Sequence, residues 1–312
     1  MNLLVTGGCG FIGSNFINYI GMKYPEYIII NIDAMYYCAN ENNVILKNNY
    51  KLIKGNLRSS DLVNYILKEY SITHVVHFAA QSHVQNSFDD SMQYTLDNIE
   101  GTHTLLECCK NYGKIEKIIH VSTDEVYGES LDEEMKHEGS VLYPTNPYAA
   151  TKAGAELIAM SYIKSYKLPI VITRGNNVYG SNQYPEKVIP RFIQQLKNNE
   201  QVTIQGNGSA RRSFLHVEDT CSAFDIILHK GEINEIYNIG TNPGESEYTI
   251  LEVAEILVKF IKGTSDWQSY VRFIDDRPFN DSRYFISNEK LKSLGWEIKI
   301  SFEEGIKKLI NY

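Results

Sequence analysis

Residues 6–13 read Thr6-Gly7-Gly8-Cys9-Gly10-Phe11-Ile12-Gly13, and this stretch decides the fold. The apolar residues 2–5 before it predict a strand, and the amphipathic run 11–22 after it predicts a helix. A glycine-rich turn between a strand and a helix lets the backbone approach a pyrophosphate and directs the first helical N–H groups at it. Three glycines alone are a weak signal, so the prediction of a dinucleotide site depends on the segment that follows.

An acidic residue follows at the position that such a motif requires. A second apolar strand, residues 27–32, ends in Asp33, about 20 residues after the glycine turn. A carboxylate there accepts hydrogen bonds from the ribose hydroxyls of NAD and repels the 2′-phosphate of NADP. The sequence therefore predicts that the chain binds NAD. The alternative is a tight turn followed by an incidental aspartate.

Strands and helices alternate through the first half of the chain. Further strands are predicted at 50–54, 74–78, 117–121 and 168–173, with helices at 61–70 and 92–111. This alternation predicts an α/β fold with a Rossmann-type, doubly wound parallel sheet. Beyond it, residues 174–177 and 184–187 are predicted as loops. We expect a Rossmann domain over 1–175, to which 217–240 return, and a smaller substrate-binding domain over 176–216 and 241–312.

Composition and charge exclude several classes of function. The chain has 312 residues and a formal net charge of −8, without a basic block, so no nucleic-acid partner is expected. No apolar run approaches the roughly 20 residues that span a bilayer, and the start of the chain lacks the features of a signal peptide. The five cysteines have no paired spacing, which predicts neither a metal site nor a disulfide. We expect a cytoplasmic protein without a membrane partner.

An acidic doublet follows the strand at 117–121, in the stretch Val121-Ser122-Thr123-Asp124-Glu125-Val126-Tyr127-Gly128. Two carboxylates at the end of a buried strand are costly to desolvate unless they have a function. Dehydrogenation does not require them. An adjacent acid and base suit the elimination of water from neighbouring carbons, because one removes a proton while the other protonates the departing hydroxyl. The alternative is a solvated acidic loop.

A second pair, Tyr148 and Lys152, lies four residues apart on one face of a predicted helix. The lysine ammonium is expected to lower the pKa of the tyrosine, so that the phenolate can take a proton from a hydroxyl as hydride leaves. The hydroxyl of Thr123 could hold the same substrate oxygen. The alternative is a tyrosine and a lysine on an ordinary helix surface.

Together these motifs resemble the extended short-chain dehydrogenase/reductases, and specifically the nucleotide-sugar 4,6-dehydratases. The Thr-Asp-Glu triplet at 123–125 separates dehydratases from the epimerases and decarboxylases that share the Tyr–Lys pair. Residues 36–40 and 277–281 resemble the UDP-glucose enzymes, including the first domain of UDP-rhamnose synthases, more than the dTDP-glucose enzymes. The matching segments run nearly end to end: 6–13, 79–84, 121–128, 148–152, 184–190, 212–219 and 277–284.

The resemblance implies dehydration of UDP-glucose to UDP-4-keto-6-deoxy-glucose, a step towards UDP-rhamnose or a related deoxysugar. Tyr148, with Thr123 and Lys152, would act at the 4-hydroxyl, Glu125 would remove the C5 proton, and Asp124 would protonate the 6-hydroxyl. The implied cofactor contacts are Gly7, Gly10, Phe11, Ile12, Gly13, Asp33, Asn56, Leu57, Ala79, Tyr148 and Lys152. The implied contacts with the nucleotide sugar are Ser82, Thr123, Asn177, Lys187, Arg212, Arg277 and Asn280.

The resemblance also implies a homodimer formed through the helices predicted at 92–111 and 148–166. Asn56 stands where the family usually has an aspartate near the adenine, and an amide can still hydrogen-bond there. Three alternatives stay open: the same reaction on dTDP-glucose, a UDP-sugar 4-epimerase, and a regulatory protein that senses a dinucleotide. In an epimerase Asp124 would have no catalytic role, and a sensor would need neither the Tyr–Lys pair nor the acidic doublet.

Overall fold

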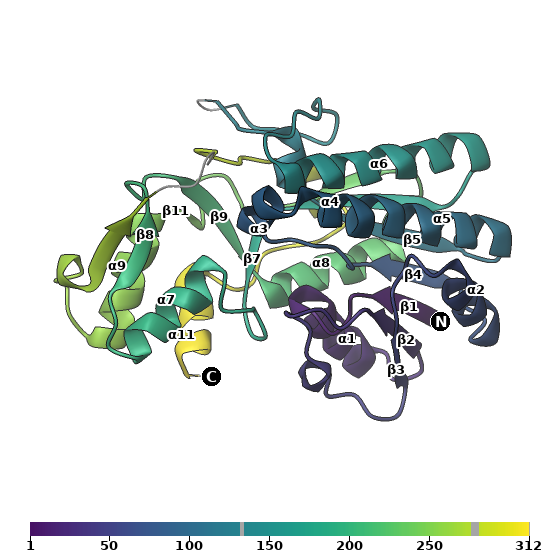
Figure 1. Ribbon diagram of the computed structural model, residues 1–312, viewed down its shortest axis with the longest axis horizontal. Coiled ribbons are helices and arrows are strands. Elements are labelled where there is room, and N and C mark those ends of the chain that lie inside the picture. The colour runs from purple at the N-terminus through teal and green to yellow at the C-terminus, as the bar shows by residue number, and fades with distance from the viewer. Residues whose placement is uncertain (132–133, 276–280, 312) are drawn as a thin grey trace.

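The computed structural model describes residues 1–131, 134–275 and 281–311. A seven-stranded sheet with the order β10-β6-β5-β4-β1-β2-β3 forms its centre (Figure 1), and every neighbouring pair of strands runs parallel. The predicted α/β fold with a doubly wound parallel sheet is confirmed. The strands are β1 (Asn2–Thr6), β2 (Ile28–Asp33), β3 (Tyr50–Lys54), β4 (His74–His77), β5 (Lys117–Thr123), β6 (Ile170–Gly175) and β10 (Ile236–Ile239).

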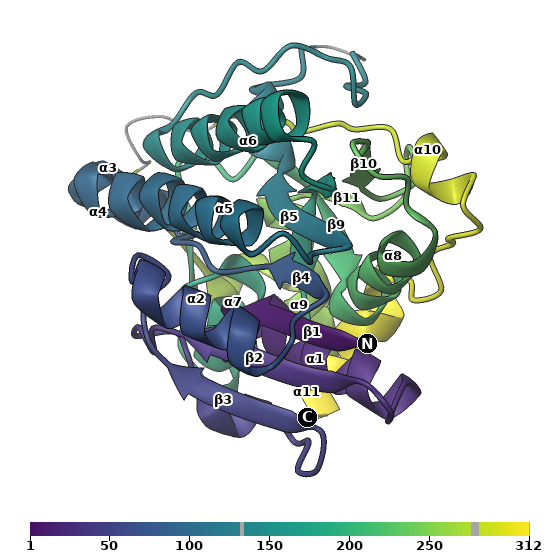
Figure 2. The same ribbon diagram turned by 90° about the vertical axis from the view of Figure 1, so that its right-hand side faces the viewer.

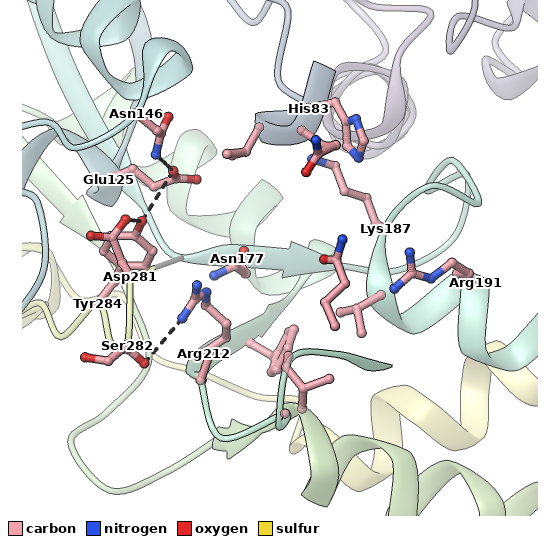
Figure 3. Close-up of a pocket in the computed structure, with 18 of the residues that line it drawn as sticks. His83, Glu125, Asn146, Asn177, Lys187, Arg191, Arg212, Asp281, Ser282 and Tyr284 are labelled. Atoms are coloured by element: carbon pink, nitrogen blue, oxygen red, sulfur yellow. Dashed lines mark hydrogen bonds between the residues drawn. The ribbon is translucent and has the colours of Figure 1, made fainter. Parts of the chain in front are cut away.

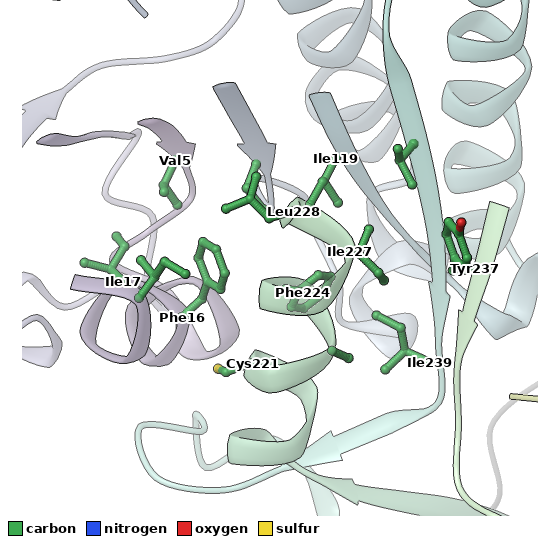
Figure 4. Close-up of a cluster of buried hydrophobic side chains, with 14 of the residues drawn as sticks. Val5, Phe16, Ile17, Ile119, Cys221, Phe224, Ile227, Leu228, Tyr237 and Ile239 are labelled. Atoms are coloured by element: carbon green, nitrogen blue, oxygen red, sulfur yellow. The ribbon is translucent and has the colours of Figure 1, made fainter. Parts of the chain in front are cut away.

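Helices cover both faces of this sheet, which is why its strands are apolar almost throughout. On one face lie α1 (Phe11–Lys23) and α8 (Val217–Lys230); on the other lie α2 (Ser60–Glu69), α5 (Gly101–Tyr112) and α6 (Pro147–Tyr166). Figure 2 shows α5 and α6 on the side of the sheet opposite α8. Successive side chains of a strand enter opposite cores. In β1, Leu3 and Val5 join the α1–α8 core of Figure 4, and Leu4 joins the other.

A smaller region lies beside the sheet, at the left of Figure 1. It contains a three-stranded sheet of order β11-β9-β7 and a two-stranded sheet of β12 and β8. Phe192, Val253 and Phe302 are fully or almost fully buried in its separate core. Its strands are β7 (Asn177–Tyr179), β8 (Val202–Gln205), β9 (Arg211–His216), β11 (Glu247–Thr249) and β12 (Val271–Ile274); its helices are α7 (Val188–Lys197), α9 (Ile250–Lys262) and α11 (Phe302–Asn311).

One prediction of local structure was wrong, and another is refined by the structure. Residues 174–177 are not a loop, because β6 extends to Gly175 and β7 begins at Asn177. The predicted helical run at 92–111 is helical throughout, but α4 (Ser91–Tyr94) and α5 are joined by a π-helical segment, Thr95–Glu100. Within that segment the buried Asn98 accepts a hydrogen bond from the Gln81 N–H at 2.7 Å and donates to the Gln81 carbonyl at 3.1 Å. The π-helical segment thus holds the main chain of Gln81, which follows β4, through two hydrogen bonds.

Short elements complete the described chain: α3 (Val84–Asp89), α10 (Glu289–Lys292) and the 3-10 turns Glu41–Asn43, Asp124–Tyr127 and Gln268–Tyr270. The division into two domains stays a prediction. Leu291 and Trp296, which fall in the predicted 241–312 part, pack in the α1–α8 core of the large sheet. No helix in the described ranges is long and apolar enough to cross a membrane. Those ranges also contain no group of three His, Cys, Asp or Glu placed to hold a metal ion.

A buried ion pair ties α6 to β6. The Arg174 guanidinium donates to the Glu156 carboxylate at 2.7 Å and to the Tyr127 hydroxyl at 2.8 Å, and the Arg174 and Glu156 side chains are 2% and 0% exposed. Glu156→Gln is expected to lower the free energy of unfolding by about 3–5 kcal/mol, because it leaves a buried guanidinium without its counter-charge. Urea unfolding measures this loss.

Two further variants test the cause of that loss. Replacing both partners, Arg174→Met with Glu156→Leu, should restore much of the stability, because no uncompensated charge remains. Glu107→Gln breaks the ion pair with Lys110 on the surface, where an effect within about 1 kcal/mol is expected. An effect of Glu156→Gln as small as that of Glu107→Gln would contradict the buried-charge explanation.

Candidate active site

A pocket of about 250 Å³ opens at the carboxyl ends of the central strands. Ser82 and Lys187, which were predicted as substrate contacts, also line it. The side chains that enclose it come from the turn after β1, the end of β2, the segments after β3 and β4, and the start of α6. Every residue that the sequence assigns to the cofactor lines this pocket: Gly7, Gly10, Phe11, Ile12, Gly13, Asp33, Asn56, Leu57, Ala79, Tyr148 and Lys152.

The glycine turn is packed too tightly for side chains. Gly7 has a φ of +70°, and a Cβ there would lie 2.7 Å from the Ala79 Cα. A Cβ on Gly13 would lie 2.5 Å from the Gly7 carbonyl oxygen. Gly10 is the N-cap residue of α1, and it has no side chain to cover the helix terminus. The first N–H groups of α1 therefore face the pocket at the site where a pyrophosphate fits.

Asp33 ends β2 with its carboxylate fixed by two backbone groups. Its Oδ2 accepts the Cys9 N–H at 2.9 Å, and its Oδ1 accepts the Met35 N–H at 2.8 Å. Burial raises the pKa of Asp33, and these two hydrogen bonds act in the opposite direction. Each carboxylate oxygen can accept more than one hydrogen bond. The arrangement fits the ribose of a dinucleotide.

A second pocket, of about 440 Å³, lies between the large sheet and the smaller region. Glu186 and Lys187 line both pockets, so the two adjoin. Figure 3 shows Glu125 at one end of the second pocket, Lys187 and Arg191 at the other, and Arg212 between them. This gradient from carboxylate to cations suits a neutral sugar joined to a diphosphate.

The predicted substrate residues divide between several places. Asn177, Lys187 and Arg212 line the second pocket, whereas Ser82 lines the first. Thr123 is buried at the end of β5. Arg277 and Asn280 lie outside the described residues. The structure therefore brings three of the predicted contacts together around one cavity.

Tyr148 and Lys152 come from the first turns of α6, which begins where the Asn146 side chain accepts the Ala149 N–H at 2.9 Å. Both side chains are buried. Burial, followed by the nearby Glu125, raises the pKa of Tyr148, and a hydrogen bond with Thr123 acts the other way.

Lys152, the predicted partner of Tyr148, forms a hydrogen bond with the main chain. Its ammonium donates to the Val121 carbonyl at 2.7 Å. Burial lowers the pKa of Lys152 to about 8, and the Glu156 carboxylate offsets part of that effect. In this structure the pKa of the phenol is therefore governed by burial and by the Glu125 carboxylate, which outweigh any lowering by the ammonium.

Asp124 and Glu125 form a 3-10 turn directly after β5. Asp124 is 2% exposed and accepts the Asn176 side-chain amide at 2.6 Å and the Thr123 hydroxyl at 3.2 Å. Burial, with the neighbouring Glu125, raises the pKa of Asp124 to about 7. A carboxyl group with such a pKa is partly protonated near neutral pH, and it can then donate a proton.

Glu125 differs from its neighbour because it lines the second pocket. Its Oε2 accepts the Asn146 amide at 2.9 Å and the Tyr284 hydroxyl at 3.5 Å. Burial raises the pKa of Glu125, against the effects of Asn146, Arg212 and Lys187. The doublet thus presents one carboxyl at the cavity wall and one behind it.

Four polar residues of this site received no role from the sequence. Asn146 precedes a proline, and an asparagine before Pro147 is an N-cap signal that could have identified it. Asp281 accepts hydrogen bonds from the Thr145 and Tyr284 hydroxyls; Asp281 and Tyr284 lie in a matched segment but were given no function. Asn176 was predicted in a loop. Its contact with Asp124 joins residues 52 positions apart, and no local sequence pattern predicts it.

The family model described as GDP-mannose 4,6 dehydratase matches residues 4–309. The chain is 48% identical over its whole length to a trifunctional UDP-glucose 4,6-dehydratase/UDP-4-keto-6-deoxy-D-glucose 3,5-epimerase/UDP-4-keto-L-rhamnose-reductase of Arabidopsis thaliana, of which it spans only 46%. It is also 48% identical to the dTDP-D-glucose 4,6-dehydratase of Mus musculus, with 99% of this chain and 88% of the mouse protein aligned.

A solved structure extends the comparison to three dimensions. The dTDP-glucose 4,6-dehydratase of Bacillus anthracis, determined in complex with NAD, superimposes with a TM-score of 0.91 and 40% identity. That alignment covers 100% of this chain and 96% of the bacterial one. Since the family model and the relatives cover almost every residue of the sheet, of the smaller region and of both pockets, this chain belongs to the nucleotide-sugar 4,6-dehydratases of the short-chain dehydrogenase/reductase fold.

Proposed function

We propose that the chain catalyses the NAD-dependent dehydration of UDP-glucose to UDP-4-keto-6-deoxy-glucose. The observation that carries this proposal is the placement of Asp124 and Glu125 near Tyr148, with Glu125 at the wall of the second pocket, Asp124 behind it and Tyr148 at the wall of the adjoining first pocket. A simple dehydrogenase has no use for this acidic doublet. The resemblance of residues 36–40 to the UDP-glucose enzymes supports uridine as the base, and the relatives include enzymes named for each nucleotide.

The second pocket would hold the nucleotide sugar. Lys187 and Arg212 would bind the diphosphate oxygens, because cationic donors form strong, charge-assisted hydrogen bonds with phosphate. Asn177 would add an amide donor beside them. Residues 176–216 and 241–312, which supply Asn177, Lys187 and Arg212, would then form the nucleotide-sugar-binding domain, with Arg277 and Asn280 as further contacts.

The first pocket would hold the cofactor. The turn at Gly7, Gly10 and Gly13 would bind the pyrophosphate, Asp33 the adenosine ribose, and Asn56 and Leu57 the adenine. When bound, NAD⁺ would accept hydride from C4 of the sugar and return it to C6, so the reaction has no net redox change. This would place the cofactor in the domain formed by residues 1–175 and 217–240.

The chain's own residues would move three protons. Tyr148, beside Thr123 and Lys152, would take the proton of the 4-hydroxyl. The ketone at C4 acidifies the C5–H, and Glu125, at the cavity wall, would remove that proton and give it back to C5 when hydride returns to C6. Asp124 would give its proton to the 6-hydroxyl, which leaves as water. An acid with a pKa of about 7 suits this transfer near neutral pH.

We also propose that two copies associate through the face formed by α4, α5 and α6. Met92, Leu157 and Tyr166, on α4 and α6, are 68%, 59% and 54% exposed, and a partner subunit would cover them. The product would enter a route towards UDP-rhamnose or a related deoxysugar.

Incubation of the purified chain with NAD⁺ and either UDP-glucose or dTDP-glucose tests the proposed function. Nuclear magnetic resonance of the product should identify a 4-keto-6-deoxy sugar, formed with a higher kcat/KM from UDP-glucose. A preference for dTDP-glucose would overturn the choice of base. A galactose-configured product would identify an epimerase, and tight NAD binding without turnover of either sugar would favour a dinucleotide sensor.

A further inference from the structure

Asn176 lies between β6 and β7, with 6% of its surface exposed. Its Oδ1 accepts the backbone N–H of Thr241 at 3.0 Å. That contact fixes the orientation of the amide, because a backbone N–H requires an oxygen opposite it. The Nδ2 group must then point the other way, where it donates to Asp124 Oδ2 at 2.6 Å.

The turn after β10 (Ile236–Ile239) packs against the Asn176 amide. A Cβ on Gly240 would lie 2.8 Å from Asn176 Oδ1, so only glycine leaves room for it. The Asn176 backbone N–H donates to the Ile239 carbonyl at 3.0 Å. From the other side, Asn288 Nδ2 donates to the Gly240 carbonyl at 2.9 Å. The main chain and the side chain of Asn176 are therefore both held by the same turn.

Asp124 has two side-chain donors, Asn176 and Thr123, and the contact with Asn176 is shorter by 3.2 − 2.6 = 0.6 Å. The ionisable groups that face it come from three elements. Glu125 belongs to the same 3-10 turn, Tyr148 to α6, and Arg212 to β9. Glu125 disfavours a second negative charge on Asp124, whereas Arg212 favours it. Because the Thr241 N–H holds the amide oxygen of Asn176, its Nδ2 group can only donate to Asp124, whereas the Thr123 hydroxyl can either donate or accept.

We propose that Asn176 is a positioning residue for the acid of the dehydration, holding Asp124 Oδ2 as a hydrogen-bond acceptor so that Oδ1, the oxygen next to Thr123, carries the transferred proton. This inference rests on the proposed function, in which Asp124 protonates the leaving 6-hydroxyl. The amide favours the carboxylate form and so opposes the burial that favours the acid form. Asp124 can then give up its proton and regain it in the next turnover.

The decisive variant is Asn176→Leu, which keeps the size of the side chain and removes the donor. Without the donor the carboxylate form of Asp124 is less stable, so its pKa rises. The basic limb of the kcat profile, where Asp124 loses its proton, should move up by about one pH unit. The plateau of kcat should fall by roughly tenfold to a hundredfold, because the acid is weaker and less well held. A merely structural role would lower the plateau without moving the limb.

A second readout needs no substrate. Protein labelled with ¹³C at the aspartate carboxyl carbons allows the titration of Asp124 to be followed by nuclear magnetic resonance, with its signal assigned by its loss in Asp124→Asn. The midpoint should rise by about one unit in Asn176→Leu. Gly240→Ala, which displaces Asn176 Oδ1 but retains the amide, should shift it in the same direction, so the test survives if one variant fails to fold.

Asn288→Leu is a control for loosening of the turn, since it removes the donor to the Gly240 carbonyl but leaves the hydrogen bond between Asn176 and Asp124 in place. Its midpoint should shift by much less than that of Asn176→Leu. Equal midpoints in Asn176→Leu, Gly240→Ala and the wild type would overturn the inference. If the wild-type chain turned over neither nucleotide sugar, the proposed function would fail. The titration would still decide whether the hydrogen bond from Asn176 lowers the pKa of Asp124.

Discussion

Glu125→Gln is expected to lower kcat by roughly a hundredfold to ten-thousandfold, because glutamine cannot accept the C5 proton. Its amide oxygen can still accept the Asn146 amide that bonds Glu125 in the wild type at 2.9 Å, so the site should keep its shape. Oxidation at C4 depends on Tyr148 and should continue. Rapid mixing with UDP-glucose should therefore show the absorbance of reduced nicotinamide rising and persisting, while almost no 4-keto-6-deoxy product forms.

The dependence on pH provides a second sign of the same base. Glu125 acts in its ionised form, and burial raises its pKa above the value of an exposed glutamate. The rate should therefore fall as the pH is lowered through that raised pKa, at a higher pH than an exposed carboxylate would give. The residual activity of Glu125→Gln should lack this acidic limb.

Glu129→Gln serves as the control, since Glu129 lies four residues further along the chain and lines neither pocket. Its kcat should stay within a few-fold of the wild type. If Glu125→Gln formed product at the wild-type rate, or failed to accumulate reduced nicotinamide while kcat fell, Glu125 would not be the base of the elimination step.

Local sequence patterns predicted the fold and placed the two pairs of residues that we propose as catalytic. The glycine turn and Asp33 lie within one strand–helix–strand unit, whose geometry follows from steric rules that act over a few residues. Asp124 and Glu125 are adjacent, and Tyr148 and Lys152 are one helical turn apart, so each pair is placed as soon as its own element forms. These features could be predicted because their spacing is short.

The remaining features arise from contacts between distant segments. Asn176 reaches Asp124 across 52 positions, and Tyr284 reaches Glu125 across 159. The strand β9 carries two arginines, and it becomes a strand by pairing with β7 on one side and β11 on the other. Such tertiary pairing overrides local preference. The hydrogen bond from the Lys152 ammonium to the Val121 carbonyl, 31 residues away, could not be predicted from the local pattern either.

Tyr148→Phe should stop the reaction one step earlier than Glu125→Gln. Phenylalanine keeps the ring, including its edge-to-face contact with Tyr94 at 6.4 Å between centroids, and loses only the hydroxyl. Without it the proposed acceptor of the 4-hydroxyl proton is lost, so we expect kcat to fall by roughly a hundredfold to ten-thousandfold. In contrast to Glu125→Gln, the same rapid mixing should show no rise in the absorbance of reduced nicotinamide.

The double variant determines the order of the two steps. If oxidation at C4 must precede removal of the C5 proton, Tyr148→Phe combined with Glu125→Gln should behave as Tyr148→Phe alone, without any accumulation of reduced nicotinamide. Tyr143→Phe, at a tyrosine that is 77% exposed, controls for the change of residue type and should leave kcat unchanged. Accumulation of reduced nicotinamide in Tyr148→Phe at the rate seen for Glu125→Gln would remove Tyr148 from the oxidation step, and the acceptor of the 4-hydroxyl proton would then have to be sought among the other groups at that end of the pocket.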